Sequence, residues 1–255
     1  MNRIEVNVLN PGAAVEAAHM AVTAARLTQG GHKIHNMQDF MDLYNKTYSK
    51  DFVRNLCLLP HPTLQKFSVI NIAVVGASRR FLAQITRHQN EVKFMSASLQ
   101  YSDYSGQADF VVPYELFGKP EQMELYLKAC RAMMGLYQSM VQNGCDNDTA
   151  GYAAPQGLRN ILIISATPYQ WKHMISQRIC RRNTDETRYV MLLCWFQLQM
   201  ICPELFADAG CDCMTGSCRE RKMSCGRPCD NTWTALDILK EDFPLIWEEE
   251  ALYED

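Results

Sequence analysis

FSVINIAVVGASRRFLAQITRH, residues 67–88, is the stretch that decides the expected fold. The β-branched residues of 67–75 predict a strand that is buried on at least one face and bounded by Gly76. Ser78 is a suitable N-cap for a helix that follows this strand. The stretch therefore predicts a strand, a short turn and a helix in direct succession, with polar residues gathered at the end of the helix.

Hydrophobic patterns on both sides of this stretch predict further elements. Alternation predicts a strand over residues 4–8, and a second apolar run occupies 161–164. Helical spacing predicts helices over 13–27, 39–55, 120–142 and 188–200, and a helix that carries His173, Gln177, Arg178 and Arg182. We therefore expect an α/β (α+β) fold in which a central mixed sheet is flanked by long helices, within a single domain over residues 1–255.

The composition is that of a globular protein and argues against two kinds of partner. The chain has 255 residues, of which 47% are hydrophobic, and a formal net charge of −3. Binding to a nucleic acid polymer needs a dense basic surface, so no such partner is expected. No long apolar stretch and no signal pattern are present, so we expect a cytoplasmic protein without a membrane partner. The acidic segment 248–255 is expected to be a solvated tail.

A first polar group lies at the end of the helix predicted after Ser78. Gln84 precedes Arg87 and His88 by three and four residues, which places these side chains on one side of the last turns. Hydroxyls and amides follow at Ser96, Ser98, Gln100, Tyr101, Ser102 and Tyr104. Such groups can hold a phosphate and a planar heterocycle, because arginine offers the bidentate fork that phosphate favours. An amphipathic helix end followed by an ordinary polar loop explains the same residues.

A second polar group combines His173 and Gln177 with the arginines that follow them. Residues four apart share a helix face, so Arg178 and Arg182 form a local positive surface in an acidic chain. This surface suits an anionic ligand. The alternative is a solvated ion pair between Arg182 and Glu186, which contributes little to stability.

The eleven cysteines are densest in the Cys-rich segment 202–229. Zinc usually takes its thiolates from two short-spaced pairs such as C-x-x-C, and that spacing is absent. The spacings Cys213-x4-Cys218 and Cys225-x3-Cys229 leave a zinc site open as the alternative. Reduced structural thiols are expected instead, and no residue is assigned as a metal ligand.

The order of these pieces resembles the flavin-dependent thymidylate synthase family from about residue 24 to residue 228. In the first half, the similar segments are Ala24-Ala25-Arg26-Leu27, His61-Pro62-Thr63, Ser78-Arg79 and Gln84-x-x-Arg87-His88, the last resembling the start of the signature R-H-R-x-x-S-x-x-x-x-S-x-R-Y. In the second half, Trp171-Lys172-His173-Met174-Ile175-x-x-Arg178 resembles W-R-H-F-I-x-x-R, and 206–226 resembles a tail found in some members. Each piece is weak alone, but their order and spacing together are specific.

The resemblance implies an enzyme that methylates dUMP reductively to dTMP. Methylenetetrahydrofolate would donate the carbon, and FAD would be the cofactor, reduced by NADPH. The family fold is an α/β fold assembled as a homotetramer, with each active site built from several subunits. The protein would orient and polarise the reactants while the flavin carries the difficult chemistry.

The resemblance also implies a role for individual residues. Arg178 and His173 would be the catalytic residues, with Arg178 polarising the uracil carbonyl and His173 near the flavin or folate. The flavin site would be formed by His61, Thr63, Arg87, His88 and Gln89. The nucleotide would be held by Gln84, Arg87, Ser98, Gln100, Tyr101, Arg159 and Arg178.

Several positions depart from the family pattern. Gln89 and Gln100 stand where the signature has arginines, and Gln100 is at a position expected to bind the nucleotide phosphate. Lys66 replaces a glutamate expected near the flavin, and Tyr169 replaces an arginine. These departures motivate two alternatives. The first is a flavin enzyme that modifies another pyrimidine nucleotide, for example by hydroxymethylation, and the second is a non-catalytic homologue.

Overall fold

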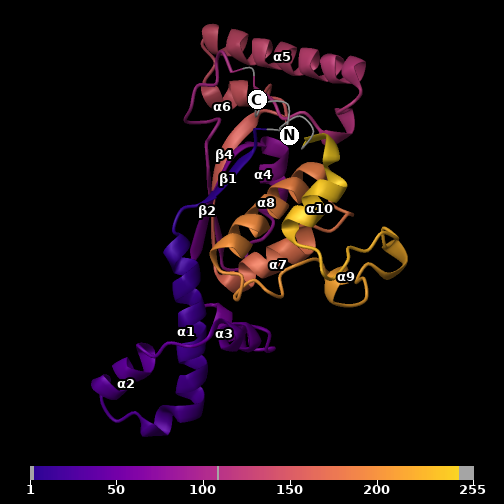
Figure 1. The fold of residues 1–255 in the computed structure, drawn as a ribbon. Coiled ribbons are helices and arrows are strands. Elements are labelled where there is room, and N and C mark those ends of the chain that lie inside the picture. The colour runs from indigo at the N-terminus through magenta and orange to yellow at the C-terminus, as the bar shows by residue number, and fades with distance from the viewer. Residues whose placement is uncertain (1–2, 108, 247–255) are drawn as a thin grey trace, which may run out of the picture.

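The computed structural model describes residues 3–107 and 109–246, which are built around a four-stranded sheet (Figure 1). The strands are β1 (Glu5–Val8), β2 (Ile70–Ser78), β3 (Val92–Ser96) and β4 (Arg159–Ala166), in the order β1-β2-β4-β3. All three pairings are antiparallel. The α/β class is confirmed, whereas the expected mixture of pairing directions is wrong, because hydrophobic patterns indicate strands without indicating how they pair. The tail predicted at 248–255 lies outside the described residues.

Helices cover one face of this sheet and extend beyond both of its ends. They are α1 (Pro11–Gly30), α2 (Met37–Tyr44), α3 (Lys50–Cys57), α4 (Arg79–Ile85), α5 (Pro120–Gln142), α6 (Asn147–Gly151), α7 (Pro168–Arg178), α8 (Asp185–Ile201), α9 (Asp212–Thr215) and α10 (Ala235–Asp242). Short 3-10 turns occur at η1 (Gly31–Lys33), η2 (Pro62–Gln65), η3 (Tyr114–Leu116) and η4 (Arg221–Met223). In Figure 1, α7, α8 and α10 lie together beside the strands, α5 crosses one end, and α1 to α3 extend from the other.

The main core lies between the sheet and α7 and α8. Ile72 pairs with Ile164 and is fully buried with it, so side chains of even number on β2 and β4 face the helices. Trp171 of α7 is fully buried, and its indole N–H donates to the carbonyl oxygen of Ile70 at 3.0 Å. This bond fixes α7 against β2, which matters because α7 carries His173 and Arg178.

The turn from β2 into α4 is fixed by α8. Ser78 caps α4 as expected, since its Oγ accepts from the backbone N–H of Phe81 at 3.1 Å. Ser78 also donates its backbone N–H and its hydroxyl to the two carboxylate oxygens of Glu186, at 2.6 and 2.5 Å. Burial raises the pKa of Glu186, and the bonds from Ser78 oppose that rise only in part. The alternative of a solvated ion pair between Arg182 and Glu186 is therefore wrong, because Glu186 points inward to Ser78.

Several boundaries differ from those expected. The helix α4 ends at Ile85, so Arg87 and His88 lie in the turn beyond it. The helix α7 ends at Arg178, which leaves Arg182 in the following turn. The single helix expected over 39–55 is two helices, because Ser49 caps α3 by accepting from Phe52 N–H.

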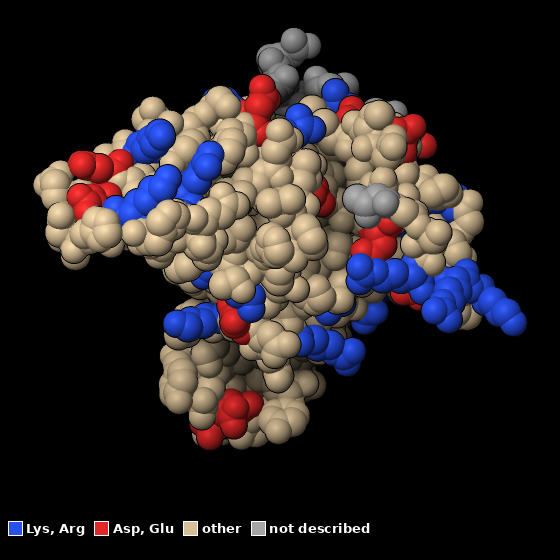
Figure 2. Space-filling model, turned by 90° about the horizontal axis from the view of Figure 1, so that it is seen from below, with Lys and Arg blue, Asp and Glu red and all other residues tan. Residues whose placement is uncertain are grey.

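The surface matches the modest charge of the chain. Figure 2 shows one face, on which Lys and Arg form separate groups with acidic residues close to some of them. None of the helices in the described ranges combines the length and the apolar character that a membrane span requires.

Candidate active site

Helix α7 stands between three adjoining pockets. The pocket on one side has a volume of about 840 Å³ and is lined by Lys66, Arg87, His88, Gln89, Asn90, Glu91, Tyr169, Gln170, His173, Gln177 and Arg178. A pocket of about 470 Å³ shares Tyr169 and His173 with it and contains His61. A pocket of about 420 Å³ shares Gln177 and Arg178 with the first and is lined by Cys180 and by five cysteines of the Cys-rich segment 202–229. We call the first of these the α7 pocket.

The α7 pocket brings together five of the expected site residues, from two separate parts of the chain. Arg87, His88 and Gln89 come from the turn after α4, and His173 and Arg178 come from α7. Arg87, Arg178 and Lys66 give the pocket three cationic side chains against one carboxylate, that of Glu91. The pocket is therefore suited to an anionic ligand.

The guanidinium of Arg178 is held in place by three groups. Its Nε donates to His88 Nε2 at 2.7 Å, its Nη2 to the Gln84 carbonyl oxygen at 3.1 Å, and its Nη1 to Asn183 Oδ1 at 3.4 Å. Burial lowers the pKa of Arg178, and the neighbouring charge of Arg87 lowers it further. An arginine held in this way presents a fixed donor surface to a ligand, with little rearrangement left on binding.

His88 acts as the acceptor for Arg178 because it is neutral. Its side chain is buried, and its pKa is lowered to about 4 by burial first and then by the charges of Arg178 and His173. A neutral ring can accept at Nε2 what a protonated ring cannot. The His173 ring lies edge-on to it, with ring centroids 5.8 Å apart.

Gln84 lies behind the pocket instead of in it. Its Oε1 accepts from the hydroxyls of Thr184 at 2.8 Å and Thr187 at 2.5 Å. Its carbonyl oxygen accepts from Arg178. In this chain, therefore, the Gln84 backbone contacts Arg178 and its side chain contacts α8. Thr184 and Thr187 lie at the start of α8, which contacts α4, and no local sequence pattern indicates that they meet Gln84.

Lys66 and Tyr169 line the pocket and were not predicted as site residues. The Lys66 ammonium lies 5.2 Å from the centre of the Tyr169 ring and 3.2 Å from a carboxylate oxygen of Glu91. These are two of the positions where the sequence departs from the family pattern. Because the two side chains contact each other, the departures at Lys66 and Tyr169 belong to one local change in the pocket wall.

The other expected residues lie outside the α7 pocket within one chain. His61 lines the adjoining pocket, and Thr63 is in η2 beside it. Ser98, Gln100 and Tyr101 belong to a turn in which Gln100 N–H donates to Ser98 Oγ at 3.1 Å, and Tyr101 is 83% exposed. Arg159 begins β4, where it donates to the Gly76 carbonyl oxygen at 2.6 Å and pairs with Asp109 at 2.9 Å.

Comparison with known proteins identifies the family to which this fold and pocket belong. The family model for the thymidylate synthase complementing protein matches residues 13–204. The flavin-dependent thymidylate synthase of Geobacter sulfurreducens is 23% identical over 205 residues, which cover 80% of this chain and 87% of that protein. The one from Nitratidesulfovibrio vulgaris is 27% identical over 186 residues, covering 69% and 75%.

Solved structures show the same fold. The UMP/dUMP methylase PolB from Streptomyces cacaoi, bound with 5-Br dUMP, aligns with a TM-score of 0.65 at 16% identity, over 82% of this chain and 97% of that one. Thymidylate Synthase X (ThyX) from Helicobacter pylori, with FAD and dUMP, aligns with a TM-score of 0.60 at 15% identity, over 81% and 98%. The fold is therefore that of the ThyX enzymes. Since the family model covers more than half of the chain, the chain belongs to the thymidylate synthase complementing protein family and is an enzyme.

Proposed function

We propose that this enzyme catalyses the flavin-dependent reductive methylation of dUMP to dTMP, with methylenetetrahydrofolate as the carbon donor and NADPH as the reductant. The observation that carries the proposal is Arg178, held by His88 and the Gln84 carbonyl oxygen in a cationic pocket of about 840 Å³. The names of the relatives and the FAD and dUMP bound to ThyX support the same reaction.

The residues of the α7 pocket fit FAD and a nucleotide. Three cations and two histidines face a single carboxylate, which is the donor set that phosphate groups require. The volume lies in the range of about 300–1,000 Å³ that is typical of cofactor and ligand pockets. Arg87, His88 and Gln89 would hold the flavin, together with His61 and Thr63 of the adjoining region. When bound and reduced by NADPH, FAD supplies the electrons for the reduction.

The chain's own residues bind and orient the reactants and polarise the pyrimidine. The Arg178 guanidinium would donate to a carbonyl oxygen of the pyrimidine and stabilise the negative charge that develops there. Neutral His88 fixes the direction of that guanidinium through the 2.7 Å bond. The Gln84 carbonyl oxygen holds the other side of the guanidinium by accepting from Nη2 at 3.1 Å. His173 shares the pocket and lies at its boundary with the His61 pocket, where it can contact flavin or folate.

The test is a titration of the purified protein with FAD, followed by dUMP. Binding of FAD, bleaching by NADPH without oxygen, and formation of dTMP once methylenetetrahydrofolate is added are the expected results. Arg178→Ala should remove dTMP formation, whereas Arg131→Ala, an exposed arginine on α5, should not. A protein that binds no FAD, or forms as much dTMP after Arg178→Ala, contradicts the proposal.

A second substrate is favoured by one feature of the sequence. Gln100 stands where the family has a phosphate-binding arginine, and PolB, which shares the fold, is described as acting on UMP as well as dUMP. The alternative is therefore modification of another pyrimidine nucleotide, with addition of a methyl or hydroxymethyl group. Incubation with dUMP, UMP and dCMP, with product masses measured, separates the two proposals. The same incubation tests the non-catalytic alternative, which requires that no product forms.

A further inference from the structure

Three cysteine sulfurs converge beside the end of α7. The Sγ atoms of Cys211, Cys213 and Cys229 all lie within 4.8 Å of one another, and those of Cys211 and Cys213 are 3.1 Å apart. Cys211 precedes α9, whereas Cys229 comes from the loop that leads to α10. The fold therefore brings distant thiols together, although the sequence spacing lacks a C-x-x-C pair.

The distances suit a shared metal ion. A disulfide requires an S–S length of about 2.03–2.05 Å, which the 3.1 Å pair does not meet. Zinc binds thiolates at about 2.3 Å, so two sulfurs of a tetrahedral site lie about 3.8 Å apart, within the spacing of this cluster. The backbone N–H of Cys229 also donates to the sulfur of Cys213 at 3.5 Å, a bond that orients a ligand from outside the coordination sphere.

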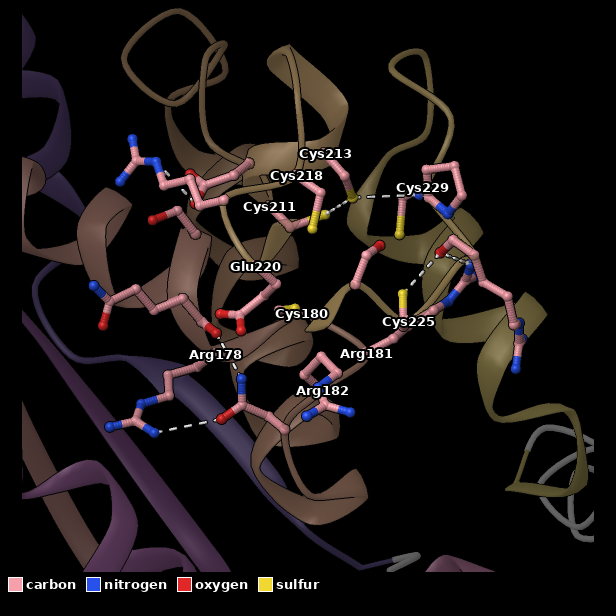
Figure 3. A pocket seen from close by; sticks show the side chains of 18 residues that line it. Arg178, Cys180, Arg181, Arg182, Cys211, Cys213, Cys218, Glu220, Cys225 and Cys229 are labelled. Carbon is pink, nitrogen blue, oxygen red and sulfur yellow. Dashed lines mark hydrogen bonds and ion pairs between the residues drawn. The ribbon is translucent and has the colours of Figure 1, made fainter. Parts of the chain in front are cut away.

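Further thiols and compensating charges line the same pocket. Figure 3 shows Cys180, Cys218 and Cys225 around the pocket that holds the cluster. A zinc ion with four thiolates carries a net charge of about −2. Arg181, Arg219 and Arg227 line this pocket, and Arg181 donates to the Arg227 carbonyl oxygen at 2.8 Å. Although Arg219 pairs with Asp212 and Arg181 with Asp242, five arginines line the pocket against the two carboxylates of Asp212 and Glu220, and this excess of positive charge offsets the charge of a four-thiolate site.

The segment around the cluster has little regular structure to hold it. Between α8 and α10, the described residues form only α9 and η4, of four and three residues. Residues 205–214 reach the main core through Leu205, Phe206 and Met214, but residues 216–228 are exposed except at Cys218 and Cys225, so this part buries little apolar surface of its own. A metal that cross-links such a segment supplies stability that a hydrophobic core cannot.

We propose that Cys211, Cys213 and Cys229, with a fourth thiolate from Cys180, Cys218 or Cys225, bind one structural zinc ion. Because the pocket is also lined by Gln177 and Arg178, the ion fastens the Cys-rich segment against the end of α7. The site is independent of the proposed reaction, since it uses no residue that would contact the nucleotide as a ligand.

The metal content of the full chain tests the site directly. The protein is produced in medium containing zinc, and zinc and iron are measured by mass spectrometry after extensive dialysis. We expect about one zinc ion per chain, and X-ray absorption at the zinc edge should show four sulfurs at about 2.3 Å. Nitrogen or oxygen ligands, iron in place of zinc, or a disulfide among these cysteines in the freshly purified protein overturns the proposal.

Serine variants identify the ligands. Cys211→Ser, Cys213→Ser and Cys229→Ser should each lose the zinc, and so should one of Cys180→Ser, Cys218→Ser and Cys225→Ser. Cys145→Ser is the matched control, because Cys145 is partly exposed and follows α5, away from this pocket. A chelator should lower the melting temperature of the wild-type protein. Zinc retained in the Cys211 and Cys213 variants, or a melting temperature that a zinc-stripping chelator leaves unchanged, refutes the site.

Discussion

Asp242 of α10 lies between two buried arginines, and replacing it with asparagine tests how α10 is held on α8. Its carboxylate accepts from Arg181 Nε at 3.1 and 3.0 Å, from Arg181 Nη2 at 2.8 Å, and from Arg188 Nη2. The exposed fractions of the three side chains are 3% for Asp242, 9% for Arg181 and 6% for Arg188. Water therefore cannot reach the two arginines and replace the hydrogen bonds that they lose when Asp242 is neutralised.

The expected cost of Asp242→Asn follows from this burial. Removing one partner from a buried charge pair costs about 3–5 kcal/mol, because the remaining charge is left without compensation. The lower end applies here, since Arg188 keeps Asp185 at 3.7 Å and Arg181 keeps the Arg227 carbonyl oxygen. A loss of about 3 kcal/mol corresponds to a melting temperature lower by about 6–12 °C for a protein of this size.

The pH dependence has a definite sign. Burial alone would raise the pKa of Asp242, but the hydrogen bonds and charges of Arg181 and Arg188 outweigh it and lower the pKa. The carboxylate therefore contributes stability that is fully present above its unfolded pKa of about 3.9 and is lost as the pH falls through the lower folded value. The Asn variant should lack this contribution at every pH.

Urea denaturation at pH 7 measures the effect, with Glu241→Gln as the control. Glu241 is the adjacent residue on α10 and is exposed, so its neutralisation removes the same charge without a buried partner. We expect the unfolding midpoint of Asp242→Asn to fall with an unchanged slope and that of the control to stay near wild type. If the two variants differ by less than about 1 kcal/mol, the pairing does not hold α10 in place.

Three further predictions concern the candidate active site. Arg178→Lys keeps the charge but loses the planar fork that meets His88 and Gln84, so kcat should fall by about 10²–10³-fold in steady-state assays, and a near-wild-type kcat contradicts the assigned role. The His88 ring should stay neutral from pH 7 down to about 5 in NMR titration, because its pKa is about 4, and a midpoint near 6.5 contradicts the buried acceptor. Gln100→Arg should tighten dUMP binding by about 10–100-fold in calorimetry, the equivalent of a charge-assisted bond, and an unchanged affinity shows that Gln100 does not meet the phosphate.

Local patterns in the sequence predict the elements that carry the site. The helix over 120–142 coincides with α5, because Pro120 begins it and Gln142 precedes the Asn143-Gly144 turn. Residue type alone predicts Ser78 as a helix cap, and the bond from Phe81 N–H to its Oγ confirms that prediction. Such features depend on neighbours within one turn of the chain, which a single sequence contains.

The sequence does not predict contacts between residues that are far apart in the chain. Strand β3 has few β-branched residues, and it is a strand only because β4 offers its free edge for pairing. Helical spacing groups Gln84 with Arg87 and His88, yet its side chain accepts from the hydroxyls of Thr184 and Thr187, about a hundred residues further along the chain. The cysteine cluster is a third case, since the residues that meet are Cys211, Cys213 and Cys229 and not the pairs that spacing suggests.

The residues left outside the α7 pocket bear on how the site is completed. Ser98, Gln100 and Arg159 do not line the pocket that contains Arg178 of the same chain. The sheet also keeps an apolar face outside the helices, where Val75, Ile161 and Ile163 are 41%, 53% and 41% exposed. Val75 pairs with Ile161, so these side chains adjoin, and contiguous exposed apolar surface is typical of protein contact sites. The homotetramer implied by the family resemblance would account for both features, because a second copy packed on this surface would cover it and the site would then draw residues from more than one chain.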